Sequence, residues 1–194
     1  MKEENKKKMG SPKIRLIAGL GNPGDEYENT YHNIGVLTLE YLIRKSLLDT
    51  KKMKPIRNSF EYIKAGAVAW VRSLKYMNKS GKAIAAAARF FDVKPEEIMI
   101  LHDDSDLHIG EVKFTFDRGS AGHRGVQSII DQFGTKKFFR TRIGIRPERK
   151  NQERRKKASE LVLGNIAPED RKKLIAVFKN IQNELMRVIG VIGT

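Results

Sequence analysis

Short β-rich runs alternate with helical patterns along this chain, and that alternation restricts its fold more than any other feature. The run IRLIAG from Ile14 is typical of a strand, and the chain-turning residues GNPG follow it at once. The next segment, 32–48, repeats apolar residues at helical spacing, so the sequence opens with a strand, a loop and a helix. This pattern predicts one α/β domain with a largely covered sheet.

The later elements continue the alternation and carry apolar residues at the matching periods. We expect a hairpin from 60–64 and 68–74, strands at 97–101, 111–116 and 138–145, and helices at 79–91, 124–133 and from Pro168 onward. The length of 194 residues suits one catalytic domain over 14–194. Residues 1–13 hold five lysines and two glutamates without apolar periodicity, which predicts a flexible basic tail.

The chain is strongly basic, with 38 Lys and Arg against 23 Asp and Glu and a net charge of +15. That charge makes a polyanion the natural partner. Residues 136–157 hold eleven Lys or Arg against two Glu, whereas residues 92–111 hold seven acids against Lys94 alone. Either run alone is also typical of a solvated surface. Together they favour a protein that holds a phosphate backbone while it works on another group.

The residue types that are missing also exclude functions. There is no cysteine, which excludes disulfide scaffolds, thiolate zinc sites and cysteine nucleophiles and fits a cytoplasmic setting. The most apolar stretches, 65–71 and 83–91, are too short to cross a bilayer, and the N-terminus lacks a signal-peptide core. We therefore expect no membrane association.

A glycine-rich motif, GLGNPG at 19–24, follows the first strand and matches the dinucleotide-binding pattern GxGxxG. In that pattern the helix begins within the motif, whereas here Pro23 and the polar run DEYENT delay it, so we reject a dinucleotide site. A plain turn is the simple alternative. It leaves Asn22, which offers both hydrogen-bond donors and an acceptor, unexplained at the end of a strand.

His32 stands where the first helix is expected to begin, and it is either a helix cap or a general base. A neutral imidazole can take a proton from water if an acceptor holds its other ring nitrogen. Carboxylates for that purpose follow the strand 97–101 in the run His102-Asp103-Asp104-Ser105-Asp106. The same run, with His108, could instead bind a metal ion, although its ligand spacing is loose and it lacks a glycine-shaped turn.

Two further segments carry candidate binding groups. The run GSAGHRG at 119–125 opens an expected helix whose free backbone N–H groups could bind an anion, with His123 and Arg124 directed toward it. A flexible loop is the alternative. Asn78 precedes the alanine-rich helix, either as an ordinary N-cap or as a hydrogen-bond donor to a carbonyl.

Taken in order, these segments closely resemble the bacterial-type peptidyl-tRNA hydrolases. The resemblance rests on GLGNPGDEYENTYHNIG at 19–35, YMNKSGKAI at 76–84, ILHDDSDLHIGEVKF at 100–114, GSAGHRG at 119–125, FRTRIGI at 139–145 and LVLGNIAPED at 161–170. It implies a monomeric α/β enzyme with a mixed central sheet and helices on both faces. Such an enzyme needs no cofactor and cleaves the ester that joins a peptide to the terminal ribose of tRNA.

The resemblance also implies roles for individual residues. His32 resembles the base that activates water, Asp103 the carboxylate that orients it, and Asn22 an amide that holds the substrate. Contacts with tRNA phosphates are implied for Lys113 and Arg142. The remaining positions implied to bind substrate are Tyr27, Tyr76, Met77, Asn78, His123 and Arg124, with Met77 forming a wall of the peptide groove.

Three positions depart from the family pattern. Arg124 stands where most members have asparagine, and because arginine only donates hydrogen bonds, it could bind the substrate carbonyl or a phosphate. Tyr31 replaces a common arginine and Thr115 a common basic residue, so phosphate contacts could shift toward residues 136–157. The departure at Arg124 keeps open a second function, a catalytically inactive RNA-binding protein of the same fold that acts in RNA processing.

Overall fold

A seven-stranded mixed sheet forms the centre of the molecule, in the order β2-β3-β4-β1-β5-β7-β6. The computed structural model describes residues 13–147 and 157–189. Strands β4, β1, β5 and β7 run parallel, while β2, β3 and β6 pair antiparallel with their neighbours. The strands are β1 (Leu16–Gly19), β2 (Lys54–Ile56), β3 (Phe60–Ala65), β4 (Val68–Ser73), β5 (Ile98–His108), β6 (Val112–Phe116) and β7 (Phe139–Arg146).

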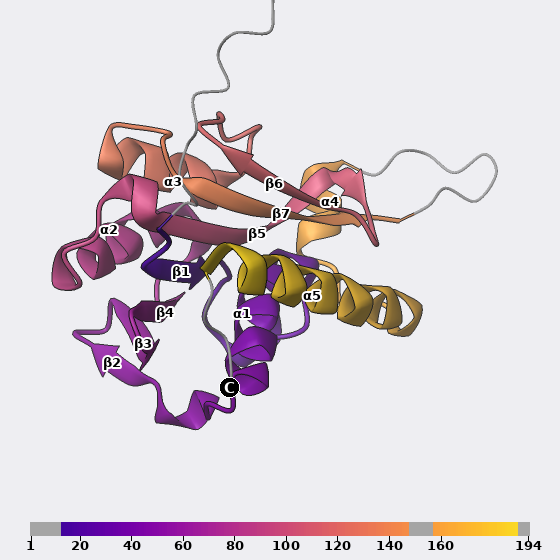
Figure 1. Ribbon diagram of the computed structural model, residues 1–194. Helices are drawn as coiled ribbons and strands as arrows, with labels where there is room; N and C mark the ends of the chain where they lie inside the picture. The colour runs from indigo at the N-terminus through magenta and orange to yellow at the C-terminus, as the bar shows by residue number, and fades with distance from the viewer. Residues whose placement is uncertain (1–12, 148–156, 190–194) are drawn as a thin grey trace, which may run out of the picture.

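Helices cover both faces of the sheet (Figure 1). They are α1 (Ile34–Lys45), α2 (Ser80–Phe90), α3 (Arg124–Phe133), α4 (Ala158–Val162) and α5 (Pro168–Ile189). One core joins α1 and α5 to the sheet and a second joins α2 and α3 to it. Ile17 of β1 lies in the first core, whereas its neighbours Leu16 and Ala18 lie in the second, as side chains alternate along a strand. The expected class, an α/β domain with helices on both faces, is confirmed.

Most expected elements occur with nearly the expected bounds. The hairpin is β3 and β4, the helix at 124–133 is α3, and Pro168 begins α5. The short strand β2 and the five-residue helix α4 were not expected. Residues 1–12 of the expected basic tail and 148–156 of the basic run lie outside the described residues. No helix in the described part of the chain has the length and apolar character needed to span a bilayer.

One expected boundary is wrong. The strand expected at 97–101 continues as β5 through His108, so the polar run after Leu101 belongs to the sheet instead of a loop. The cause is strand pairing, because β7 accompanies β5 through Asp103 and Asp104 before the register shifts. On its other side, β1 accompanies β5 only as far as the pair Gly19↔Leu101. Beyond that pair, the edge of β5 is open to the loop that follows β1.

Candidate active site

The candidate site lies at the carboxyl ends of the neighbouring strands β4, β1 and β5. From β1 the chain passes into α1 on one face, and from β4 it passes into α2 on the other, so the connections diverge here. Parallel sheets place ligand sites at such switch points, outside the carboxyl ends of the strands. Asp103 lies two residues beyond the last pair of β1 with β5 and is 1% exposed.

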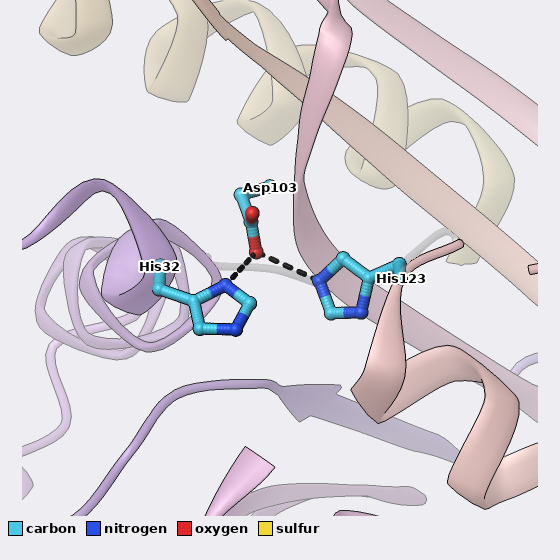
Figure 2. Close-up of side chains that lie close together, drawn as sticks. All are labelled: His32, Asp103 and His123. Atoms are coloured by element: carbon cyan, nitrogen blue, oxygen red, sulfur yellow. Dashed lines mark hydrogen bonds and ion pairs between the residues drawn. The ribbon is translucent and has the colours of Figure 1, made fainter. Parts of the chain in front are cut away.

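Two histidines from distant segments bind the same oxygen of Asp103 (Figure 2). Nδ1 of His32 lies 2.9 Å from Asp103 Oδ1, and Nε2 of His123 lies 2.7 Å from it. A buried carboxylate accepts hydrogen bonds, so each of these ring nitrogens carries its proton toward Asp103. The expectation that His32 and a carboxylate of the β5 run meet is confirmed.

The two imidazole rings also stabilise the charge on Asp103. Burial alone would raise the pKa of this carboxyl group, because a charged group loses its hydration. The attraction and hydrogen bond of His123, followed by those of His32, outweigh burial and hold the pKa of Asp103 well below its usual range. Asp103 is therefore an ionised acceptor at neutral pH.

Close packing at the start of α1 brings His32 to this carboxylate. A side chain at Gly35 would place its Cβ 2.2 Å from the Leu101 carbonyl oxygen and 2.6 Å from that of Leu20, so only glycine allows this approach. His32 lies in a 3-10 turn, and the N-cap of α1 is Asn33, so the helix-cap alternative for His32 is wrong. Within the described part of the chain, His32 Nε2 has no hydrogen-bond partner, and it faces away from Asp103 (Figure 2).

Tyr31 ties the His32 segment to the start of α5. Its N–H donates to the Gly164 carbonyl at 3.0 Å, and its hydroxyl donates to Asp170 Oδ2 at 2.5 Å. Burial, followed by the hydrogen bond to Asp170, raises the pKa of Tyr31 to about 12. A neutral, buried tyrosine thus holds the turn that carries His32.

His123 is placed differently, because its ring caps α3. Its Nδ1 accepts hydrogen bonds from the backbone N–H groups of Gly125 at 3.1 Å and Val126 at 3.2 Å. Both ring nitrogens of His123 are therefore occupied, one as donor to Asp103 and one as acceptor. These bonds occupy two of the N–H groups that we expected to be free to bind an anion at the start of this helix.

A third histidine, His102, lies beside this pair without joining it. It is 1% exposed, its Nδ1 lies 2.7 Å from the Asp103 carbonyl oxygen, and its ring contacts His123 edge-on at 4.7 Å between centroids. Its Nε2 is buried and has no hydrogen-bond partner among the described residues. Burial, and then the neighbouring His123, lower the pKa of His102 well below its usual range, so this ring is neutral.

Asn22 lies on the loop between β1 and α1, and hydrogen bonds fix its orientation. Its Oδ1 accepts the N–H of Met77 at 2.8 Å, which leaves the amide N–H groups as donors. The side chain of Asn33 holds the loop by binding the Asn22 N–H at 2.8 Å and the Asn22 carbonyl at 2.9 Å. Asn33 was not among the expected site residues, although it directly follows His32 in sequence.

A cavity of about 810 Å³ opens over these groups. His32, Asp103 and Met77 form its buried floor, and the expected residues on its exposed rim are Tyr76, Asn78 and Arg124. Asn22 and His123 also line it, together with Val162 at the end of α4 and Leu163 directly after it, two residues that the sequence did not indicate because α4 itself was not expected. Tyr27 does not line the cavity but contacts Tyr76 edge-on, at 6.4 Å between ring centroids.

Lys79 is the N-cap of α2, so the N-cap alternative for Asn78 is wrong.

Lys113 and Arg142, expected to bind tRNA, lie directly opposite each other on β6 and β7. Lys113 is exposed. The Nε of Arg142 donates to Asp104 Oδ2 at 2.6 Å, which orients the guanidinium. Neither residue lines the cavity, so they form a basic surface separate from it.

Metal binding was a second interpretation of residues 102–108. These residues lie on β5, and its two buried carboxylates turn to different partners. Asp103 turns to the histidines, while Asp104 pairs with Arg142. The described residues that could gather around one ion are His32, Asp103 and His123, whose ligand atoms lie within 4.8 Å of one another. His123 does not fit such an ion, because its Nδ1 is an acceptor and the proton therefore occupies Nε2, the atom that would have to bind the metal.

The fold and this cavity define an α/β protein of the hydrolytic class. Asp103 fixes one nitrogen of the His32 ring and leaves the other for a reactant, the arrangement by which hydrolytic enzymes activate water. The family model for peptidyl-tRNA hydrolase matches residues 16–191. The chain therefore belongs to the peptidyl-tRNA hydrolase family.

Individual relatives agree with that assignment. The peptidyl-tRNA hydrolase of Prochlorococcus marinus is 38% identical over 178 residues, which make up 89% of this chain and 86% of that protein. That of Lactobacillus gasseri is 36% identical over 183 residues, or 90% and 94% of the two chains. The crystal structure of peptidyl-tRNA hydrolase from Acinetobacter baumannii matches with a TM-score of 0.80 and 26% identity, covering 93% of this chain and 91% of that one. These relatives give no support to the inactive RNA-binding alternative.

Proposed function

We propose that this chain hydrolyses the ester between the peptide and the terminal ribose of peptidyl-tRNA, with His32 as the general base. The observation that carries the proposal is the pair of bonds that fix Asp103 between two histidines, while His32 lines the cavity and its Nε2 has no partner among the described residues. Asp103 is a positioning residue, because it holds the proton of His32 on Nδ1 and thereby keeps the lone pair on Nε2.

The reaction needs one water and no change of oxidation state. Nε2 of His32 takes a proton from the water as its oxygen bonds to the ester carbon, which leaves a negative charge on the former carbonyl oxygen. The amide N–H groups of Asn22 and Asn78 are the proposed donors to that oxygen. When the intermediate collapses, the bond to the ribose oxygen breaks and His32 returns its proton to that oxygen. The products are a free peptide acid and a tRNA with an intact terminal hydroxyl.

The other candidate residues divide between the two halves of the substrate. Met77, Tyr76 and Tyr27 offer apolar and aromatic surface to the peptide, with Met77 on the floor of the cavity and Tyr27 behind Tyr76. His123 acts on the reaction by fixing Asp103, because it has no free lone pair. We propose that Lys113 and Arg142 contact the tRNA backbone, which suits their position on the basic strands β6 and β7.

The same proposal extends to the setting of the enzyme. Action as a monomer is part of the proposal, because the resemblance to the family implies it. A cytoplasmic location, where translation produces peptidyl-tRNA, follows from the proposed substrate.

Release of free tRNA from N-acetyl-aminoacyl-tRNA tests this function. We expect wild type to release tRNA and His32→Ala to lose that activity. The rate for wild type should fall toward acidic pH, because only a neutral ring accepts a proton. His108→Ala is the matched control, since it removes an exposed imidazole from the same strand as Asp103 but outside the cavity. Undiminished release by His32→Ala would remove the proposed base, and loss of activity in EDTA would favour a metal mechanism.

A further inference from the structure

Two cationic side chains on the rim of the cavity have no acidic partner among the described residues. Arg124 begins α3 and Lys79 precedes α2, and both side chains are exposed. Among residues 13–147 and 157–189, no acidic side chain pairs with either of them and no side-chain hydrogen bond is made by either. The carboxylates of Asp103 and Asp104 in the same cavity are already bound by histidines and by Arg142. The rim therefore carries uncompensated positive charge, which attracts an anion.

Packing between α2 and α3 fixes where these cations lie. The Gly81 N–H donates to Ser128 Oγ at 3.1 Å, which joins the first turn of α2 to the second turn of α3. A Cβ at Gly125 would lie 2.4 Å from Met77 Sδ, so the residue after Arg124 lies directly against the floor of the cavity. Arg124 is thereby held at the border between the buried floor and solvent.

That border is where the last phosphate of the substrate has to lie. The reacting ester must reach His32, which is 8% exposed, whereas the rest of the tRNA remains outside the cavity. The terminal nucleoside then spans the distance from floor to rim. Its 5′-phosphate is the anion of peptidyl-tRNA nearest to the ester, and every tRNA carries it regardless of sequence.

Two backbone N–H groups at this helix start are already bound, which favours side chains as ligands of this phosphate. His123 Nδ1 accepts the N–H groups of Gly125 and Val126 at the start of α3. An arginine fork matches phosphate oxygens, and a lysine adds a point charge. We propose that Arg124, assisted by Lys79, binds the phosphate that joins the terminal nucleotide to the rest of tRNA. This inference rests on the proposed hydrolysis of peptidyl-tRNA and assigns one further contact within that site.

Two small substrates isolate the contact. One is the N-acetyl-aminoacyl 3′-ester of adenosine, and the other is the same ester of adenosine 5′-monophosphate, so they differ by the phosphate alone. We expect wild type to hydrolyse the phosphate-bearing ester with a kcat/KM higher by about tenfold or more, the usual size of a charge-assisted contact. In R124Q the two esters should become equal within about twofold, while R124K, which keeps the charge without the fork, should retain part of the preference.

Arg89→Gln is the matched control, because it removes the same charge from the exposed C-terminal end of α2 and should keep the wild-type ratio. A ratio near one in wild type, or an unchanged ratio in R124Q, would overturn the inference while leaving hydrolysis of peptidyl-tRNA intact. An equal loss on both esters would assign Arg124 to the ester carbonyl instead. Failure of wild type to cleave either ester or N-acetyl-aminoacyl-tRNA would instead contradict the proposed function itself.

Discussion

The turn before α1 and the start of α3 each present a histidine to the same oxygen of Asp103, yet the two rings have different chemistry. Before α1, His32 donates a hydrogen bond from Nδ1 to the carboxylate, and its Nε2 remains for the cavity that the residue lines. At α3, His123 donates a hydrogen bond from Nε2 to the same oxygen, but its Nδ1 caps the helix. The partner of the second nitrogen therefore decides which histidine can act as a base.

The same comparison explains why three histidines in one small region do not compete for protons. His102, buried beside His123, is neutral and makes its bond to a backbone carbonyl. The role of each ring follows from its hydrogen bonds, which no residue type alone reveals.

The largest expected effect separates the two histidines by activity. His32→Ala should lower kcat for tRNA release by about 10²- to 10⁴-fold, the usual worth of a general base. Binding of tRNA should change by less than about twofold, because His32 carries no phosphate contact in this account. Single-turnover hydrolysis of N-acetyl-aminoacyl-tRNA, with tRNA binding measured by filter retention, gives both values. A loss of binding equal to the loss of rate would show that the residue has a structural role.

Asp103→Asn should remove the charge on which both rings depend. An asparagine still accepts a hydrogen bond, but it no longer stabilises the protonated His32 formed during the reaction, so kcat should fall by at least about 10²-fold. Because the pKa of Asp103 is lowered in the folded protein, its ionisation stabilises folding above a pH of about 4. Urea unfolding of wild type from pH 7 to pH 3 should therefore show a loss of stability at the acidic end that is reduced in Asp103→Asn.

His123→Ala should affect folding more than chemistry. It removes the cap of α3 and one donor to a buried carboxylate, which should cost about 1–3 kcal/mol of unfolding free energy. We expect kcat to fall by about tenfold, well short of the loss for a general base. His123→Asn restores a good capping residue and should recover part of the stability in urea unfolding. Equal rate losses for His123→Ala and His32→Ala would contradict the division between the rings.

His102 should contribute a pH dependence of stability without a direct role in the reaction. Its pKa is lowered by folding, so below a pH of about 6.5 the unfolded chain binds a proton at His102 that the folded chain does not. Stability then falls with decreasing pH, by up to about 1.4 kcal/mol per pH unit from this group. Urea unfolding at pH 7, 6 and 5 should show a shallower fall in His102→Asn. Parallel curves for the two proteins would mean that His102 is protonated in the folded state.

The smallest effect concerns the basic strands. Lys113→Gln should lower the slope of log K for tRNA binding against log salt by about one unit at most and leave kcat unchanged. Lys64→Gln, on exposed surface of β3, should keep the wild-type slope. Titrations of tRNA at several salt concentrations measure both, and an unchanged slope for Lys113→Gln would place the tRNA elsewhere.

Sequence patterns could predict the alternation of helices and strands because apolar periodicity records burial directly. They could not predict that β5 continues through Asp103 and Asp104, since polar residues in a strand usually indicate its end. Each of these carboxylates is stabilised by a partner far along the chain, Asp103 by His32 and His123 and Asp104 by Arg142. Such partners become visible only in the folded protein.

The same limit applied within the site. His32 stood out because an imidazole at the start of a helix, with carboxylates after a neighbouring strand, suggests a base. The capping bond of His123 was hidden, because histidine is not a usual cap and the segment GSAGHRG favours a helix start with free N–H groups. Asn33 and Tyr31 act through contacts to Asn22 and Asp170, and neighbouring residues gave no sign of those contacts.

The proton positions on the two rings test the central claim most directly. Long-range ¹⁵N–¹H NMR correlations on histidine-labelled protein at pH 7.5 report which nitrogen of each ring is protonated, with His32→Ala and His123→Ala supplying the assignments. We predict a proton on Nδ1 of His32 and on Nε2 of His123. A proton on Nε2 of neutral His32 would leave no lone pair toward the cavity and would contradict the account.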